Sequence, residues 1–275
     1  MSLEHRYQTL VRVARDAGRL ARRFWDERGA LTIEEKGPQD FVTLADMEVE
    51  AFIRRELAAA HPDDGFLGEE TVASFEAGAD RLWIVDPIDG THNFLRGIPY
   101  WNVSIAFVER GVRTLGAVYD PAHDELFHAR RGRGAWCSDA TGEARLAIRP
   151  ATTLAGSLVA IGHSDRYVDP RYVTLRRALM DEGVAFRNFG AAALQLAHVA
   201  EGRLDGYVEL ELSAWDAMAG LLLVEEAGGQ VGPFPGPEGL TAMATVIATA
   251  PGIAAAITGL VAASLASSPP PRRSR

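Results

Sequence analysis

An apolar strand that runs into acidic residues constrains the fold of this chain more than any other segment. Residues 82–94 read LWIVDPIDGTHNF, so four apolar positions lead directly into Asp86, and Asp89 follows three residues later. Carboxylates are costly to bury without a partner, and Pro87 stiffens the step between the two acids. We therefore expect Asp86 to close a buried strand and a turn to point both acids at one cation.

The residues after Asp89 point to an anion beside that cation. Gly90 offers a flexible backbone amide and Thr91 adds a hydroxyl. Amides in a nest or at the start of a helix can hold an anion. Oxygen ligands without cysteine or histidine favour Mg²⁺ over zinc. The segment therefore predicts a metal-assisted phosphate site.

Other common sites leave patterns that this sequence lacks. It has no G-x-x-x-x-G-K-[ST] phosphate loop, no H-E-x-x-H zinc motif and no G-x-S-x-G nucleophile elbow. The run GRGAWC begins like a dinucleotide fingerprint, but it lacks the final glycine and follows an expected hairpin. Gly90 comes directly after Asp89, which breaks the spacing of an EF-hand loop.

Charge and cysteine content narrow the class of protein. The 275 residues carry a formal net charge of −9, which argues against non-specific binding to nucleic acids or anionic membranes. The single cysteine, Cys137, rules out an internal disulfide framework. The first residues lack the uninterrupted apolar core of a signal peptide, so we expect a reducing, cytoplasmic location. Residues 241–268 are uncharged, but Pro251 divides them into an expected strand and a packed helix rather than a membrane span.

The spacing of apolar residues divides the chain into two halves. Helical spacing predicts helices over 7–25 and around 49–57, with a loop over 29–41 between them. Strand-like runs between 102 and 136, with no helix among them, predict an antiparallel sheet. Beyond residue 150, strand-like and helix-like segments alternate, which suggests α/β layering. We therefore expect an α+β domain over 1–145, an α/β domain over 146–266 and a disordered, proline-rich tail over 267–275.

Two further acidic positions fit a metal site but also have ordinary explanations. Glu69 and Glu70 end an expected strand, where adjacent glutamates often form a solvated turn. Asp216 begins an apolar helix, where an acid often serves as a cap or matches the macrodipole. The residue pattern alone leaves both explanations open.

Four segments together resemble the inositol monophosphatase family of Mg²⁺-dependent phosphatases. They are DFVTLAD, GEE, WIVDPIDGTHNF and WDAMAGLLLVEEAGG, in this order, and the likeness extends from the first expected helix to the last. The resemblance implies a phosphoric monoester hydrolase with two or three Mg²⁺ ions per active site. It also implies an α/β fold of alternating helix and sheet layers, with the metals between the two halves, and a homodimer.

The resemblance assigns the metal ligands residue by residue. One Mg²⁺ would be held by Glu69, Asp86 and the backbone carbonyl of Ile88, and a second by Asp86, Asp89 and Asp216, with Glu69 contributing to a weaker third.

The resemblance also assigns the residues around the reacting phosphate. Gly90 and Thr91 would offer backbone amides to the phosphate, and Thr91 would pair with Asp46 to orient and deprotonate the attacking water. Glu209, seven residues before Asp216, would contact hydroxyl groups of the substrate ring. Lys36 would lie in a mobile loop near the metals.

Two departures from the family pattern bear on the substrate. His92 stands where many members have a small hydroxyl residue or a lysine, and we interpret it as a loop histidine that faces solvent. Ala191 replaces a hydroxyl residue that contacts substrate in the animal inositol enzymes, so one sugar-hydroxyl contact is expected to be missing.

The leading hypothesis is a phosphatase acting on inositol 1-phosphate or a similar polyol or sugar phosphate, with a small-molecule ester as its partner. Within the same family, fructose 1,6-bisphosphate and histidinol phosphate are the alternatives, the first because RGIPYWNVSIAF resembles members that accept it. A regulatory binding protein that serves a protein or RNA partner is the alternative from a different class. The same segment, FLRGIPYW, suits either a dimer contact or the core.

Overall fold

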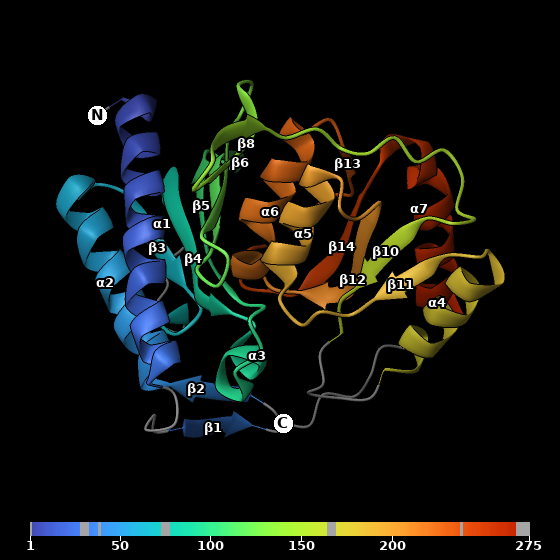
Figure 1. Ribbon diagram of the computed structural model, residues 1–275, viewed down its shortest axis with the longest axis horizontal. Helices are drawn as coiled ribbons and strands as arrows, with labels where there is room; N and C mark the ends of the chain where they lie inside the picture. Colours follow the sequence, from blue (N-terminus) through green and yellow to red (C-terminus); the bar gives the residue numbers. More distant parts are fainter. Residues whose placement is uncertain are drawn as a thin grey trace.

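Helices and sheets alternate in layers across the molecule (Figure 1). The structure is a computed structural model that describes residues 2–27, 33–37, 40–72, 78–163, 169–236 and 239–267, without the side chains of 33–37 and 40–43. A first pair of helices, α1 and α2, covers one sheet, and α5 and α6 lie between that sheet and a second one. The pair α4 and α7 covers the far side of the second sheet. This arrangement is the layered α/β fold that the resemblance implies.

The N-terminal half supplies the first pair of helices and the larger sheet. Its elements are α1 (Leu3–Asp26), β1 (Ile33–Gly37), β2 (Asp40–Thr43), α2 (Leu44–Ala60), β3 (Gly65–Gly68), β4 (Arg81–Asp89), α3 (Thr91–Arg96), β5 (Asn102–Glu109), β6 (Val112–Asp120), β7 (Glu125–Arg130), β8 (Gly134–Asp139) and β9 (Gly142–Arg145). Strands β3 to β9 follow one another in a 7-stranded sheet, antiparallel except for the parallel pair β3 and β4.

The C-terminal half supplies the smaller sheet and the remaining helices. Its elements are β10 (Leu158–Ile161), α4 (Pro170–Asp181), β11 (Ala185–Arg187), α5 (Ala192–Glu201), β12 (Gly206–Leu212), α6 (Ala214–Glu226), β13 (Gln230–Val231), β14 (Ala244–Thr249) and α7 (Pro251–Ser267). The 5-stranded sheet has the order β11-β10-β12-β14-β13, with β10 parallel to both of its neighbours and β14 antiparallel to both of its own.

Apolar periodicity explains how each layer packs. In α1, Leu10, Val13 and Ala17 recur at helical spacing, are fully buried, and pack with α2 against the larger sheet. In β12 the side chains alternate between faces: Tyr207 belongs to the central cluster with α5 and α6, whereas Val208 belongs to the outer cluster with α4 and α7. The larger sheet therefore packs between α1 with α2 and the central helices, and the smaller sheet packs between those central helices and α4 with α7.

A one-residue irregularity in β4 places the two acids of the opening segment. Asp86 is opposite Ser104 in β5, but Asp89 is opposite Asn102, so three steps along β4 match two along β5. In a regular strand, residues three apart point to opposite faces. The extra residue of this bulge brings Asp89 round to the side of Asp86, and Pro87 falls inside the bulge, where a missing N–H is tolerated. The expectation that Asp86 closes the strand is wrong, because β4 continues to Asp89.

Three other features differ from the sequence-based expectations. The hairpin of β1 and β2 occupies the region expected as a loop. The Gly-Thr turn opens a short helix, α3, so that His92 lies in a helix rather than a loop. Helix α7 includes Ser267, the first residue of the expected tail, and the rest of that tail lies outside the described residues. The two-domain division at residue 146 stays a prediction.

No helix in the described part of the chain is long and apolar enough to cross a membrane. The segment FLRGIPYW contributes Phe94 and Trp101 to the core, whereas Arg96, Ile98 and Pro99 are exposed.

Candidate active site

Residues from both halves of the chain line one pocket of about 240 Å³. Among the residues with described side chains that the resemblance assigns to metal, water, phosphate or substrate, all except Asp46 line it: Glu69, Asp86, Ile88, Asp89, Gly90, Thr91, Ala191, Glu209 and Asp216. Strand β4 and helix α3 form one side of this pocket, and β12 with the start of α6 forms the other.

Three carboxylates meet in this pocket. Asp86, Asp89 and Asp216 each offer an oxygen atom, and these atoms lie within 4.8 Å of one another. The burial of Asp86 raises its pKa well above the ordinary value, and the charges of Glu69, Asp216 and Asp89 raise it further. The pKa of Asp89 is raised to about 7, by burial first and then by the charge of Asp216. Negative charge crowded in this way without a counter-ion is unfavourable, which makes the cluster a fit for a divalent cation.

Hydrogen bonds from three directions fix the Asp89 carboxylate. Asn102 donates to Oδ2 at 2.7 Å, and the amides of Ala192 and Ala193 donate to Oδ1 and Oδ2 at 3.0 and 2.7 Å. The two amides belong to the first turn of α5, where N–H groups have no partner within the helix. Asp89 thus joins the larger sheet to a helix from the other half of the chain.

The start of α6 is held against the larger sheet beside this cluster. Ser104 of β5 donates a hydrogen bond to the carbonyl of Trp215 at 3.0 Å, one residue before Asp216. Because Ser104 pairs with Asp86 across the two strands, the same strand positions acids from both halves of the chain.

Gly90, Thr91 and Asp46 meet at the start of α3. The Thr91 hydroxyl donates to the carbonyl of Ile88 at 3.1 Å and lies 3.5 Å from Asp46 Oδ1. Asp46 is buried in the first turn of α2. Gly90 has φ of 91°, and an added Cβ would lie 3.0 Å from the Cβ of Ala191 and 3.1 Å from the carbonyl oxygen of Gly190. A side chain at position 90 would therefore be strained and would push this turn away from the loop before α5.

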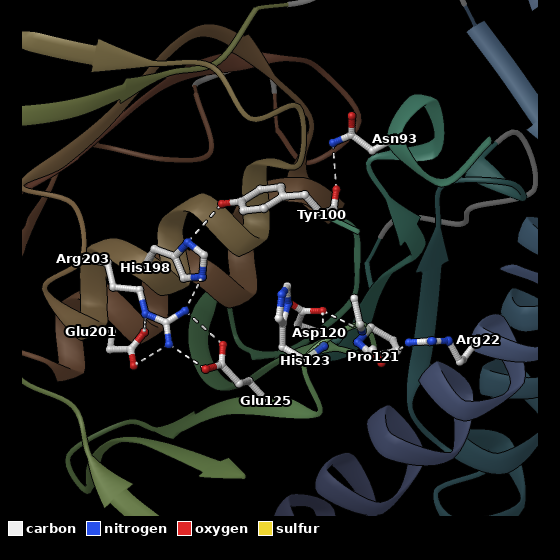
Figure 2. Close-up of polar contacts among 11 residues, drawn as sticks. Arg22, Asn93, Tyr100, Asp120, Pro121, His123, Glu125, His198, Glu201 and Arg203 are labelled. Atoms are coloured by element: carbon white, nitrogen blue, oxygen red, sulfur yellow. Dashed lines mark hydrogen bonds and ion pairs between the residues drawn. The ribbon is translucent and has the colours of Figure 1, made fainter. Parts of the chain in front are cut away.

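Asn93 ties α3 to that loop. Its side-chain amide donates to the carbonyls of Tyr100 and Phe189 at 2.8 and 2.7 Å, and Figure 2 shows the first of these contacts. The Tyr100 ring stacks on Phe189, and its hydroxyl lies 3.1 Å from His198 Nδ1. Since Arg203 can only donate to His198 Nε2, the imidazole proton is on Nδ1 and is donated to Tyr100. Burial, followed by the charge of Arg203, lowers the pKa of His198 to about 4, so this ring stays neutral.

A buried glutamate supports the turn that carries Glu69. Glu50 of α2 accepts hydrogen bonds from the amide of Glu70 at 2.9 Å and from the hydroxyl of Thr71 at 2.6 Å. It is 2% exposed, and a Cβ at Gly68 would overlap its carboxylate. Glu69 itself lines the pocket, although it is not one of the three acids in the closest group.

Replacing Glu50 by alanine is expected to lower the free energy of unfolding by about 1–3 kcal/mol, because the Glu70 amide and the Thr71 hydroxyl lose their acceptor. Urea denaturation measures this loss. Glu48→Ala is the matched control, since Glu48 is exposed on the same helix. Equal stability of the two variants would contradict the supporting role of Glu50.

The other residues that the sequence places near the substrate differ in burial and in their position relative to the pocket. Glu209 is 6% exposed and lines the same pocket as the acids. Ala191 is buried at the N-terminal end of α5. His92 is exposed at the pocket edge. Lys36 lies in β1, but its side chain is outside the described part of the chain.

Sequence reasoning missed several residues that position the acids. Glu50 follows Asp46 by four residues, so a helix there places both acids on one face, and this spacing was a usable signal. Asn102 contacts Asp89 from the neighbouring strand. The amides of Ala192 and Ala193 contact it from about a hundred residues further along the chain. No local pattern marks such contacts.

Comparisons with known proteins agree with this geometry. The sequence model of the inositol monophosphatase family matches residues 2–268. An inositol-1-monophosphatase from Mesorhizobium japonicum is 41% identical over 241 residues, which are 87% of this chain and 89% of the relative. Nus factor SuhB from Haemophilus influenzae is 39% identical over 226 residues, 82% of this chain and 83% of the relative.

A solved structure shows the same fold. The crystal structure of extragenic suppressor protein SuhB from Bartonella henselae superposes with a TM-score of 0.84 and 38% sequence identity, covering 92% of this chain and 97% of that one. Because the family model matches nearly the whole chain and relatives are about 40% identical to it, this protein is a phosphatase that belongs to the inositol monophosphatase family.

Proposed function

We propose that this phosphatase hydrolyses a polyol monophosphate such as inositol 1-phosphate. One observation carries the proposal: Asp86, Asp89 and Asp216 lie within 4.8 Å of one another and share a pocket with Glu209. The three acids can bind a divalent cation, which attracts a phosphate. The carboxylate of Glu209 can accept hydrogen bonds from hydroxyl groups of the alcohol part of the ester.

We assign the metal ligands to the acidic cluster. Asp86, Asp89 and Asp216, with Glu69 and the carbonyl of Ile88, would hold two or three Mg²⁺ ions. When bound, these ions neutralise the phosphate and make a water molecule more acidic. The Asp89 carboxylate is already held in position for this role by hydrogen bonds from Asn102 and two amides of α5.

The residues at the start of α3 would act on the water and the phosphate. The amides of Gly90 and Thr91 would donate to phosphate oxygens. The Thr91 hydroxyl, which already contacts Ile88 and Asp46, would orient the attacking water, and Asp46 would accept its proton. Phosphoryl transfer needs mainly such positioning and charge stabilisation. Lys36 remains a proposed contributor near the metals.

The charge of the pocket bears on which ester is bound. Among the described residues that line it, none is lysine or arginine, and Glu209 and Glu211 add negative charge beyond the metal cluster, although Arg171 pairs with Glu211 at 3.1 Å. A second phosphate, as in fructose 1,6-bisphosphate, would be repelled above all by Glu209. Histidinol phosphate carries an ammonium group that these carboxylates would attract, so it is the second substrate candidate within the family.

A substrate panel tests this proposal. We would measure kcat/KM with Mg²⁺ for inositol 1-phosphate, glycerol 2-phosphate, histidinol phosphate and fructose 1,6-bisphosphate. We expect inositol 1-phosphate to be preferred and fructose 1,6-bisphosphate to be the poorest. A preference for the bisphosphate would contradict the proposal, and a preference for histidinol phosphate would replace its substrate.

A regulatory binding role is the second candidate function, because a relative carries the name Nus factor SuhB. Hydrolysis of p-nitrophenyl phosphate separates the two, since a binding protein needs no turnover. We expect Mg²⁺-dependent hydrolysis. The cytoplasmic location and the homodimer stay predictions, and size-exclusion chromatography with light scattering tests the second of them.

A further inference from the structure

Tyr207 and Glu209 form a buried pair at the wall of the pocket. The two residues are on the same face of β12, two positions apart, and the Tyr207 hydroxyl donates a hydrogen bond to Glu209 Oε2. Tyr207 is fully buried and Glu209 is 6% exposed, yet both line the pocket. A substrate in the pocket can therefore contact the Glu209 carboxylate, whereas the Tyr207 hydroxyl lies almost entirely behind it.

Gly162 provides the space for this pair. It follows β10, and its amide donates to the carbonyl of Val208 at 2.9 Å, which fixes it beside β12 between Tyr207 and Glu209. A Cβ added at Gly162 would overlap both Glu209 Oε2 and the Tyr207 hydroxyl. The backbone at Gly162, just beyond β10, is thus the opposite wall of a slot that the hydrogen-bonded pair fills.

The strand register keeps Tyr207 and Glu209 together. Tyr207, Val208 and Glu209 pair in regular steps with Ala248, Ile247 and Val246 of β14, so the side chains of Tyr207 and Glu209 share one face of β12. The next pair is Leu212 with Ala244, so a bulge lies between Glu209 and Leu212. The regular segment therefore ends at Glu209, and the Tyr207 hydroxyl gives its carboxylate a specific contact there.

We propose that Tyr207 is a positioning residue for substrate selection: by donating to Glu209 in the slot beside Gly162, it holds that carboxylate where it accepts hydrogen bonds from the alcohol part of the ester. The proposal rests on the proposed function, because it assigns Glu209 to the substrate. One donated hydrogen bond uses only part of the acceptor capacity of a carboxylate, which has about four acceptor positions.

The environment keeps Tyr207 in its donating form. Burial and, after it, the charge of Glu209 raise the pKa of the Tyr207 hydroxyl well above its ordinary value. The phenol therefore stays protonated at all working pH values. Without that donor, the carboxylate loses one contact that holds it in the slot, and other rotamers compete more readily with the one that meets the substrate.

The test compares Tyr207→Phe with the wild type on two esters, inositol 1-phosphate and p-nitrophenyl phosphate, whose alcohol part has no hydroxyl to donate. We expect the ratio of their kcat/KM values to fall about tenfold, the effect of one hydrogen bond to a charged group. Gly162→Ala, which forces the carboxylate out of the slot, is expected to lower the same ratio. A purely structural role of Tyr207 would lower both kcat/KM values together.

Tyr119→Phe is the matched control. Tyr119 is 3% exposed, and its hydroxyl also donates to a carboxylate, Asp124, at 2.7 Å, but it lies in β6 against α1. We expect this variant to keep the wild-type ratio. In a Glu209→Ala background, Tyr207→Phe should change the ratio no further, because Tyr207 acts through Glu209.

The outcomes separate this inference from the proposed function. A wild type that prefers inositol 1-phosphate, with that preference intact in Tyr207→Phe, overturns the role of Tyr207 alone. A wild type without preference for any hydroxyl-bearing ester overturns the proposed substrate class and the inference with it. A further drop in the Glu209→Ala background shows that Tyr207 does not act through Glu209.

Discussion

Replacing Asp86 by asparagine is expected to lower kcat for phosphate release by at least about 10³-fold, because this one carboxylate is proposed to bind more than one of the metal ions. Asparagine has the same shape and keeps an acceptor for the amide of Ile88, which donates to Asp86 Oδ1 at 2.9 Å. The loss would therefore come from charge rather than from a cavity.

The same variant should fold normally. In the metal-free protein, burial and three neighbouring acids disfavour the ionised form of Asp86, so a neutral side chain relieves repulsion. We expect its melting temperature in EDTA to equal or exceed that of the wild type. Asp120→Asn is the matched control: Asp120 is also buried and accepts an amide two residues on, at 2.8 Å, but it is outside the pocket lining. A folded Asp86→Asn protein with near-normal kcat would contradict the assignment.

The stability of the metal-free protein is expected to depend on pH through Asp89. Its pKa is raised from 3.8 to about 7 in the folded state, so the folded protein binds a proton that the unfolded chain releases above about pH 4. Stability from this group therefore falls as pH rises from about 4 to about 7, by an amount on the order of a few kcal/mol. Mg²⁺ binds the ionised acids and opposes this loss, so it should stabilise the protein much more at pH 8 than at pH 5.5.

Comparison with Asp89→Asn removes the contribution of groups outside the acidic cluster, such as His198, whose lowered pKa acts in the opposite direction. The difference includes the effect of the Asp89 charge on the pKa of Asp86. Urea denaturation in EDTA, at several pH values, measures the difference in free energy of unfolding between the two proteins. We expect the wild type to lose stability relative to the variant as pH rises through this window. A constant difference, or a Mg²⁺-induced stabilisation that is the same at both pH values, would contradict the prediction.

Local patterns in the sequence were sufficient to locate the acids and most elements. The apolar spacing of Leu10, Val13 and Ala17 predicts α1, and the LWIV run before Asp86 predicts the buried part of β4. Both predictions depend only on the spacing of apolar residues along the chain. The hydrophobic effect favours burial of such residues in any compact fold. The resemblance to a family then predicts that Glu69, Asp89 and Asp216 lie at one site.

Features that depend on pairing between distant segments could not be predicted. The bulge that turns Asp89 towards Asp86 exists only relative to the register of β5, and the amides of Ala192 and Ala193 belong to a different half of the chain. Likewise, nothing near Gly162 in the sequence indicates that its missing side chain makes room for Tyr207 and Glu209. The close approach of Gly162 to these two side chains arises only when the segments pack together in the folded protein.

Phosphate release from inositol 1-phosphate, followed before and after removal of divalent cations, tests whether the cluster of Asp86, Asp89 and Asp216 holds the cation on which hydrolysis depends. The prediction is that EDTA abolishes release and that added Mg²⁺ restores it, in the wild type but not in Asp86→Asn. Full activity of the chelated protein, or equal recovery of the variant, would contradict the account.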